Sequence, residues 1–253
     1  MLLPSAFALL TSKTEAAYRE LFVALSTTTL VPGGIDFSTK VITTDFETGF
    51  LPVLRQVFAE IIGCYFHYCK CLLTWVKQNG LWRRYVRVPL TRRFVRRFMA
   101  LALLPLEVTE QFYRQLVADC PMSLRNFCAY WTFQWIEAVP PAEWNVFNHE
   151  KRTNNYSEGW NSKANRCAQS KHLNPWKLAI FIKDEEGEAA AKMVQTHQPG
   201  RMKRRLKKHE QVNLRIRSIV DNFMLIAQPS KDDVYKALDS LSTCILSMKS
   251  IYK

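Results

Sequence analysis

The sequence predicts an α/β fold over residues 1–80, followed by a mainly helical remainder. Up to Gly80, apolar or β-branched runs of strand length alternate with segments of helical periodicity. Such alternation is typical of a sheet covered by helices. After Gly80 the apolar residues recur at helical spacing without a clear strand pattern. The length of 253 residues suits one sizeable domain, or a domain with an appendage.

The elements of residues 1–80 follow from local patterns. The predicted strands are 2–10, 39–46 and 61–66, and the predicted helices are 13–25, 46–60 and 67–80. Thr11 or Ser12 is expected to cap the first helix. Pro52 is compatible with the second helix only if it lies in the first turn of that helix. Gly80 is expected to close the third helix.

The remaining chain divides by composition. Residues 81–147 are predicted to be helical, as an insertion or as the start of an all-helical half. From Thr153 onward the pattern is again helical, with breaks at "KHLNPW" and "HQPGR". We therefore expect a core in 1–80, a helical insertion in 81–150, further helices in 151–200 and a basic helical tail in 201–253.

Composition narrows the class of protein. Hydrophobic residues make up 48% of the chain, which is sufficient for a packed core and argues against disorder. The net charge of +13 favours an anionic partner, and nucleic acid is the commonest one. Seven irregularly spaced cysteines fit reduced thiols in the cytosol or nucleus.

Targeting and membrane signals are not expected. No apolar run approaches the roughly 20 residues that a membrane span needs. The apolar start "MLLPSAFALL" lacks the basic region of a signal peptide and is followed at once by a helical pattern. We interpret this start as a core strand.

Asp45 is the first candidate for chemistry. It stands at the end of a β-branched run, just before a predicted helix. Ligand sites in open α/β sheets lie at the carboxyl ends of strands, and a carboxylate there can hold a hard cation such as Mg²⁺. The alternative is that Asp45 caps the next helix. Position alone favours the cap.

Glu158 is the second candidate, within "RTNNYSEGWNSKANR". Asn155 and Glu158 have the spacing of a capping box. On a helix, however, Glu158 shares a face with Asn161, Ser162 and Asn165, while Tyr156, Trp160, Ala164 and Cys167 line a more apolar side. Spacing alone favours two interpretations of Glu158 equally. Glu158 is either part of a helix cap or the acid of a site in which Asn154, Asn155 and Asn161 are supporting residues.

Cys64 and His67 form a Cys-x-x-His pair that resembles half of a zinc site. No second pair at standard spacing follows, and the nearest candidate, Cys167 with His172, is poorly spaced. A buried strand cysteine beside a histidine at a helix start is the preferred interpretation, so zinc is not expected.

Two basic runs favour contacts with nucleic-acid phosphates. Arginine suits such contacts because its guanidinium fork matches phosphate oxygens. The alternatives are a solvated helix face and, for the second run, a nuclear localisation signal. The candidate residues are Arg83, Arg84, Arg92, Arg93, Arg96 and Arg97 in the first run and Arg201, Lys203, Arg204, Arg205, Lys207 and Lys208 in the second.

Several stretches, in order, resemble one family. The series resembles the transposase domain of Mutator-like elements (MULE transposases) over roughly residues 5 to 200. The order of the series is more specific than any one motif. The matching stretches are "FALLTSKTEAAYRELF", "ITTDFETGFLPVLRQVF", "IIGCYFHYCKCLLTWVKQNGL", "MALALLPLEVTEQFYRQL", "WNVFNHEKRTNNYSEGWNSKANR" and "NPWKLAIFIKDEE".

The resemblance implies a ribonuclease-H-like fold with a helical insertion, and a nuclease and strand transferase of the DDE type. Two Asp and one Glu of that family hold two divalent cations, Mg²⁺ or Mn²⁺. Asp45 matches the second Asp, Glu158 in residues 151–200 matches the Glu, and Cys64 and His67 match a family Cys-x-x-His element. DNA is then the expected partner and the nucleus the expected location, while homo-oligomerisation stays open.

One departure from the family bears on activity. Its first Asp lies on a strand upstream of "ALLTSKT", whereas the first acidic residue here is Glu15. The sequence therefore resembles a truncated, C-terminal portion with an incomplete catalytic triad. Since members of a catalytic unit act together, we expect little or no activity. A non-catalytic DNA-binding remnant is the alternative.

Overall fold

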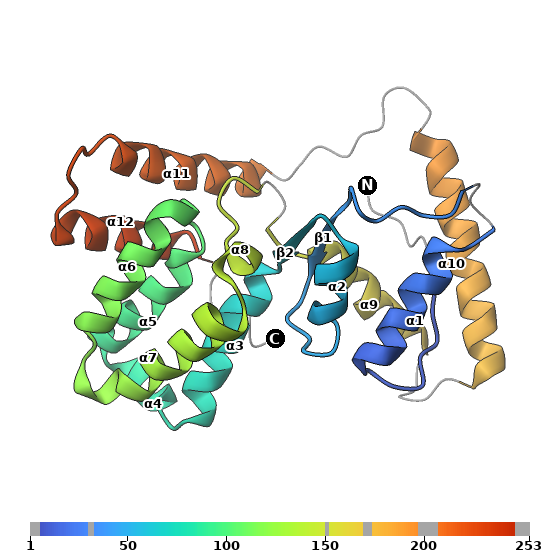
Figure 1. Cartoon of the computed structure of the whole chain (residues 1–253), viewed down its shortest axis with the longest axis horizontal. Helices are drawn as coiled ribbons and strands as arrows, with labels where there is room; N and C mark the ends of the chain where they lie inside the picture. The colour runs from blue at the N-terminus through green and yellow to red at the C-terminus, as the bar shows by residue number, and fades with distance from the viewer. Residues whose placement is uncertain (1–5, 30–32, 150–151, 169–173, 197–206, 246–253) are drawn as a thin grey trace.

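The structure is a computed structural model, and it describes residues 6–29, 33–149, 152–168, 174–196 and 207–245. Two short strands lie between two groups of helices (Figure 1). Helices α1, α2, α9 and α10 lie on one side of the strands, and α3 to α8 with α11 and α12 form a helical lobe on the other. In the described part of the chain, no helix has the length and apolar character needed to cross a membrane.

The sheet confirms the second and third predicted strands. Strands β1 (Val41–Thr44) and β2 (Glu60–Gly63) pair in parallel, with Val41 opposite Glu60 and Thr44 opposite Gly63. Helix α2 (Leu51–Val57) connects them and is shorter than the predicted 46–60, with Pro52 in its first turn. The parallel arrangement puts the carboxyl ends of both strands at one edge of the sheet.

Strand β2 ends at Gly63, three residues earlier than predicted, at a point where another segment approaches its backbone closely. A Cβ atom on Gly63 would lie 2.3 Å from the ring of Phe46 and 2.6 Å from the carbonyl oxygen of Glu143. Glycine is therefore the residue that this contact admits. The chain then turns directly into α3.

The predicted strand over 2–10 is wrong for residues 6–10, which have no regular secondary structure and are largely exposed; residues 1–5 lie outside the described part. A strand requires a neighbour for its backbone groups, and the sheet among described residues consists of β1 and β2 alone. Phe7 instead packs on Trp160, with 5.7 Å between ring centroids.

Helix α1 (Glu15–Ser26) confirms the predicted first helix but not its cap. Thr14, rather than Thr11 or Ser12, accepts a hydrogen bond from the backbone N–H of Ala17 at 3.4 Å. Tyr18 and Phe22 of this helix are buried. Their rings pack on Phe50, which fixes α1 beside α2.

Helix α3 (Tyr65–Gln78) leads from the sheet into the helical lobe. It begins directly after Cys64 and ends before Gly80, whose φ of +72° favours glycine, as predicted. The lobe continues as helices throughout 81–147, which confirms the prediction for that region. Its elements are α4 (Trp82–Arg87), α5 (Pro89–Leu101), α6 (Leu106–Ala118), the 3₁₀ turn Met122–Leu124, α7 (Arg125–Thr132), the π-helical turn Phe133–Ala138 and α8 (Pro141–Trp144).

Aromatic side chains fill the core of the helical lobe. Trp131 is fully buried, and its Nε1 donates a hydrogen bond to the Tyr68 hydroxyl at 3.0 Å. That hydroxyl in turn donates to the carbonyl oxygen of Phe98 at 2.8 Å. Two large aromatic residues are thus buried with their polar atoms satisfied, as a dry core requires.

The last helices divide between the two groups. Helix α9 (Asn155–Ala168) pairs with α10 (Pro175–Thr196), where Glu185 accepts from Trp160 Nε1 at 2.7 Å and binds Lys163. Helix α11 (Lys207–Met224) leads to α12 (Lys231–Thr243), which packs on α5. Asp239 of α12 binds Arg97 of α5 through both carboxylate oxygens, at 2.7 and 2.8 Å. The predicted basic tail therefore contributes α12 to the helical lobe.

Candidate functional site

Asp45 and Cys64 lie at the carboxyl edge of the parallel sheet. Asp45 directly follows β1, and Cys64 directly follows β2. The backbone N–H of Cys64 donates to the carbonyl oxygen of Thr44 at 2.7 Å, so the two strand ends are adjacent. This edge is where open α/β sheets bind ligands.

Glu158 reaches this neighbourhood from a distant part of the sequence. It lies in the first turn of α9, and its Oε1 is 3.3 Å from Nε2 of His67 in the first turn of α3. The Glu158 side chain is 45% exposed, whereas that of His67 is 16% exposed. His67 therefore holds a solvent-facing carboxylate beside the start of α3.

Asn154 fixes the start of α9 against the end of β2. The Cys64 thiol donates to Oδ1 of Asn154 at 3.0 Å, and the Asn154 N–H points back to the sulfur at 3.5 Å. Burial raises the pKa of the Cys64 thiol, which keeps it neutral. In this state Cys64 connects two helix starts and is a poor zinc ligand, because zinc binds the thiolate.

The capping-box interpretation of Asn155 and Glu158 does not match the helix start. Helix α9 begins at Asn155, and the Glu158 N–H donates to the carbonyl oxygen of Asn154 at 3.0 Å. Glu158 is thus the fourth helical residue rather than the third. Asn161 is exposed on the same helix, and the side chain of Asn155 lies outside the described part.

Asp45 lies near helices α1 and α3. Burial raises the pKa of the Cys71 thiol on α3, and the Asp45 carboxylate adds to this rise. Burial also raises the pKa of Tyr18 on α1 to about 12, helped by Glu47 and, more weakly, by Asp45. His67 and Cys71 are four residues apart and share a face of α3. Asp45 therefore lies near Cys71, and Glu158 contacts His67 one turn earlier on the same helix.

The donor chemistry of the site fits a hard cation in part. Neither Asp45 nor Glu158 is paired with a Lys or Arg among the described residues. Nevertheless, those residues contain no group of three His, Cys, Asp or Glu side chains placed to hold a metal ion. Mg²⁺ commonly keeps several waters and binds proteins through one or two carboxylates plus substrate phosphates. Two carboxylates that have no Lys or Arg partner among the described residues are consistent with that mode of binding.

The first basic run separates into exposed arginines and arginines that contact α12. Arg83, Arg84, Arg92 and Arg93 are exposed on α4 and α5. Arg97, by contrast, binds Asp239 and stacks over the Tyr235 ring, with 4.1 Å to its centroid. Arg96 donates to the carbonyl oxygen of Ser242. These last two arginines are engaged in holding α12 on α5.

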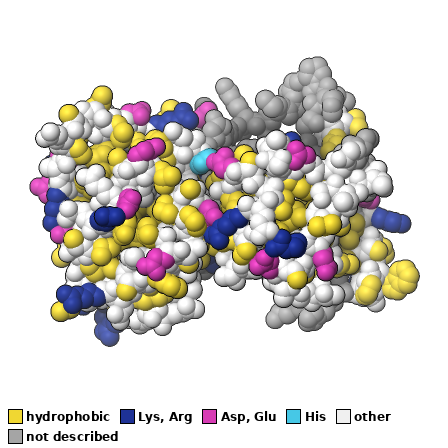
Figure 2. Space-filling view, viewed as in Figure 1, with side chains coloured by type: hydrophobic (Ala, Val, Ile, Leu, Met, Phe, Trp, Pro, Cys, Tyr) yellow, Lys and Arg dark blue, Asp and Glu magenta, His cyan; other side chains and the backbone are white. Residues whose placement is uncertain are grey.

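The second basic run lies largely outside the described part of the chain. This applies to Arg201, Lys203, Arg204 and Arg205, and to the side chains of Lys207 and Lys208 at the start of α11. On the molecular face in Figure 2, Lys and Arg side chains are scattered, with acidic side chains beside several of them. That face carries no single continuous basic patch.

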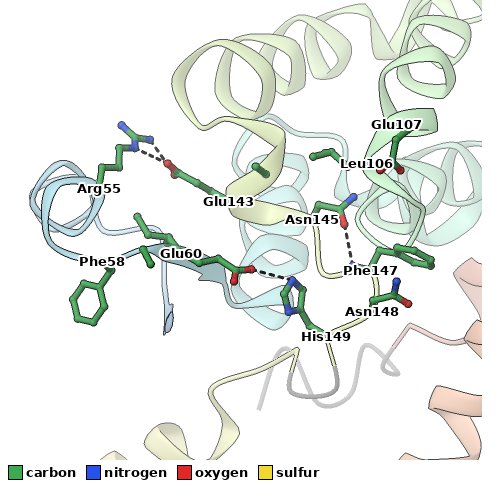
Figure 3. A pocket seen from close by; sticks show the side chains of 13 residues that line it. Arg55, Phe58, Glu60, Leu106, Glu107, Glu143, Asn145, Phe147, Asn148 and His149 are labelled. Atoms are coloured by element: carbon green, nitrogen blue, oxygen red, sulfur yellow. Dashed lines mark hydrogen bonds and ion pairs between the residues drawn. The ribbon is translucent and has the colours of Figure 1, made fainter. Parts of the chain in front are cut away.

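A cavity of about 530 Å³ at the amino end of β2 was not predicted from the sequence (Figure 3). Arg55 binds Glu143 there, with 2.5 Å from Nε to Oε1 and 3.0 Å from Nη2 to Oε2, and this pairing raises the pKa of Arg55. Glu60 lies 3.7 Å from His149 across the opening. Since Arg55 and Glu143 are 88 residues apart, no local sequence pattern predicts this ion pair. The cavity lies at the opposite end of the sheet from Asp45.

Comparisons of this chain with protein-family models, with curated proteins and with solved structures gave no match.

Proposed function

We propose that the chain carries part of a ribonuclease-H-like nuclease core of the DDE type, related to MULE transposases, with DNA as its ligand in the nucleus. Asp45 and Glu158 are the carboxylates that would hold Mg²⁺ or Mn²⁺. One observation carries the proposal. Glu158, 113 residues after Asp45 (158 minus 45), reaches the carboxyl edge of the same parallel sheet with a side chain that is 45% exposed.

The chain's own residues position these carboxylates. Nε2 of His67 lies 3.3 Å from Oε1 of Glu158, and this contact places the Glu158 side chain at the sheet edge. The Cys64–Asn154 contact fixes the helix starts that carry His67 and Glu158. Asp45 is positioned by the end of β1. A divalent ion bound there would activate the attacking oxygen and stabilise the leaving oxygen of a phosphodiester.

Two of the family's three acids have counterparts in these 253 residues, so the expected DNA cleavage is very weak. With Mn²⁺ and supercoiled plasmid, we expect this polypeptide to nick no faster than a variant carrying Asp45→Ala and Glu158→Ala. The physical reason is that catalytic carboxylates act as a unit, and loss of one lowers rates by several orders of magnitude. Gel analysis of open-circle formation over time measures this.

The matched control is Glu60→Ala, which removes an exposed carboxylate beside a histidine at the opposite end of β2. Nicking by the wild-type chain that Asp45→Ala abolishes and Glu60→Ala preserves would contradict the expected inactivity. That same result would assign a catalytic function to Asp45.

A non-catalytic DNA-binding function is the second candidate, and the exposed arginines of α4 and α5 favour it. Arg83 and Arg93 are exposed and have no carboxylate partner among the described residues. A surface of this kind binds DNA mainly through phosphate neutralisation. It requires neither Asp45 nor Glu158.

Binding of duplex DNA is therefore expected to weaken steeply with salt. A variant with Arg83→Gln and Arg93→Gln should lower the slope of log K against log salt by about 2, because each phosphate contact contributes about 0.9. Fluorescence anisotropy between 50 and 200 mM salt, a range in which about 6–10 contacts cost 10³–10⁵ in affinity, measures this slope.

The control for that titration is Arg125→Gln, which removes an exposed arginine at the start of α7. An equal loss of slope in this control would show that the effect is one of net charge rather than of the α4–α5 surface. Binding that does not depend on salt would remove the candidate function.

A further inference from the structure

Two cysteine sulfurs lie in contact at the turn between α6 and α7. Cys120 follows the end of α6, and Cys128 lies in the middle of α7. Their Sγ atoms are 2.7 Å apart, and the Cys128 thiol donates to the Cys120 sulfur. A disulfide bond is about 2.05 Å long. The two sulfurs therefore need to approach each other by well under 1 Å to be bonded.

The two thiols differ in burial. Cys128 is 4% exposed, whereas Cys120 is only half-buried. Burial, followed by the contact with Cys120, raises the pKa of the Cys128 thiol. Cys128 accordingly stays protonated and acts as the hydrogen-bond donor, and Cys120 is the sulfur that a solvent-borne reagent reaches first.

We propose that Cys120 and Cys128 are a modification site at which a low-molecular-weight disulfide, such as glutathione disulfide, forms a reversible intramolecular disulfide. The Cys120 thiolate attacks the reagent, which gives a mixed disulfide and releases one glutathione thiolate. Cys128 then loses its proton and attacks the Cys120 sulfur, which gives the Cys120–Cys128 bond and releases the second glutathione. Two protein thiols are oxidised, and one glutathione disulfide is reduced to two thiols.

This bond would brace the turn that holds α12. Asp119, next to Cys120, binds Lys231 Nζ at 2.7 Å and accepts from the Tyr235 hydroxyl and from Gln115. Lys231 and Tyr235 lie in the first turns of α12, whose far end is held by Arg96 and Arg97. The oxidised turn would therefore support a helix anchor that is distant in sequence. The inference does not depend on the proposed nuclease ancestry.

The expected energetic effect is a stabilisation of the folded state. Closing a short loop of the unfolded chain by a disulfide lowers the entropy of that chain. For a chain of this size we expect the oxidised form to have a melting temperature about 5–10 °C higher than the reduced form.

Arg125 between the two cysteines makes the test direct. The full-length wild-type protein is incubated in glutathione redox buffers, blocked with an alkylating reagent and digested with trypsin. Cleavage after Arg125 separates the two cysteines onto peptides 115–125 and 126–151. We expect mass spectrometry to find these two peptides covalently joined in the oxidised sample, and separate after reduction.

Three variants test whether the rise in melting temperature on oxidation comes from the Cys120–Cys128 bond. Cys120→Ser and Cys128→Ser should each abolish the joined peptides and the oxidation-dependent rise in melting temperature. Cys71→Ser is the matched control, because Cys71 is also half-buried and its sulfur makes no hydrogen bond to another cysteine within the described residues. It should retain both effects. If Cys128→Ser lowers stability in the reduced state, the peptide linkage in wild-type protein still decides the question.

The overturning results are specific. Peptides 115–125 and 126–151 that stay separate in oxidised wild-type protein would refute the proposal. Joining of peptide 115–125 to a peptide carrying a different cysteine would refute it equally, since the contact of the two sulfurs would then not direct the chemistry.

Discussion

Replacement of Trp131 by alanine is expected to lower the free energy of unfolding by about 3–5 kcal/mol. Trp131 is fully buried, and its indole packs against Phe98 and Trp144, with ring centroids 4.9 and 5.6 Å away. The substitution leaves a large cavity that close-packed neighbours fill only in part. It also removes the donor that the Tyr68 hydroxyl accepts from. Chemical denaturation followed by circular dichroism measures the change.

Trp176→Ala is the matched control for Trp131→Ala. Trp176 lies in the first turn of α10 and is 79% exposed. Its replacement should therefore change the free energy of unfolding by less than about 0.5 kcal/mol. A loss below about 1 kcal/mol for Trp131→Ala would mean that the helical lobe is not packed around this indole.

The local elements could be predicted because their signals are local. The β-branched run Val41–Thr44 forms β1, and Gly80 closes α3, because each depends on the conformational preferences of a few residues. The strand predicted at 2–10 failed for the opposite reason. Apolar character favours burial of a segment, but a strand also needs a neighbouring strand to pair with. Phe7 packs against Trp160 instead.

The candidate site could be predicted only in pieces. The end of β1 points to Asp45, but the contact of Glu158 with His67 requires the chain to return to the sheet after the whole helical lobe. The Cys64–Asn154 contact spans 90 residues for the same reason. Such contacts arise from packing, and the spacing of residues in the sequence does not encode them.

The arginine run illustrates the same limit. Arg93 and Arg97 stand on one helix and look equivalent in sequence. Arg97 has a carboxylate partner 142 residues away, whereas Arg93 is exposed. The position of α12 therefore decides which arginines remain on the surface.

Asp45→Asn and Glu158→Gln are each expected to weaken Mn²⁺ binding by at least about 10-fold. Replacement of residues in the outer shell of a metal site already costs about 10–100-fold in affinity, and these substitutions remove a charged ligand. Both keep the size of the side chain, so the fold should be unaffected. Glu60→Gln, which alters a 51% exposed carboxylate beside His149, should leave Mn²⁺ affinity unchanged.

The stoichiometry of Mn²⁺ binding, measured by isothermal titration calorimetry on these variants and on the wild-type chain, tests the shared site most directly. If one ion is held jointly by the carboxylates of residues 45 and 158, both single substitutions weaken the same binding event, and the double variant lacks it. If each substitution removes a different ion, or if neither alters binding while Glu60→Gln does, the two acids do not share a metal and the proposed nuclease ancestry loses its structural basis.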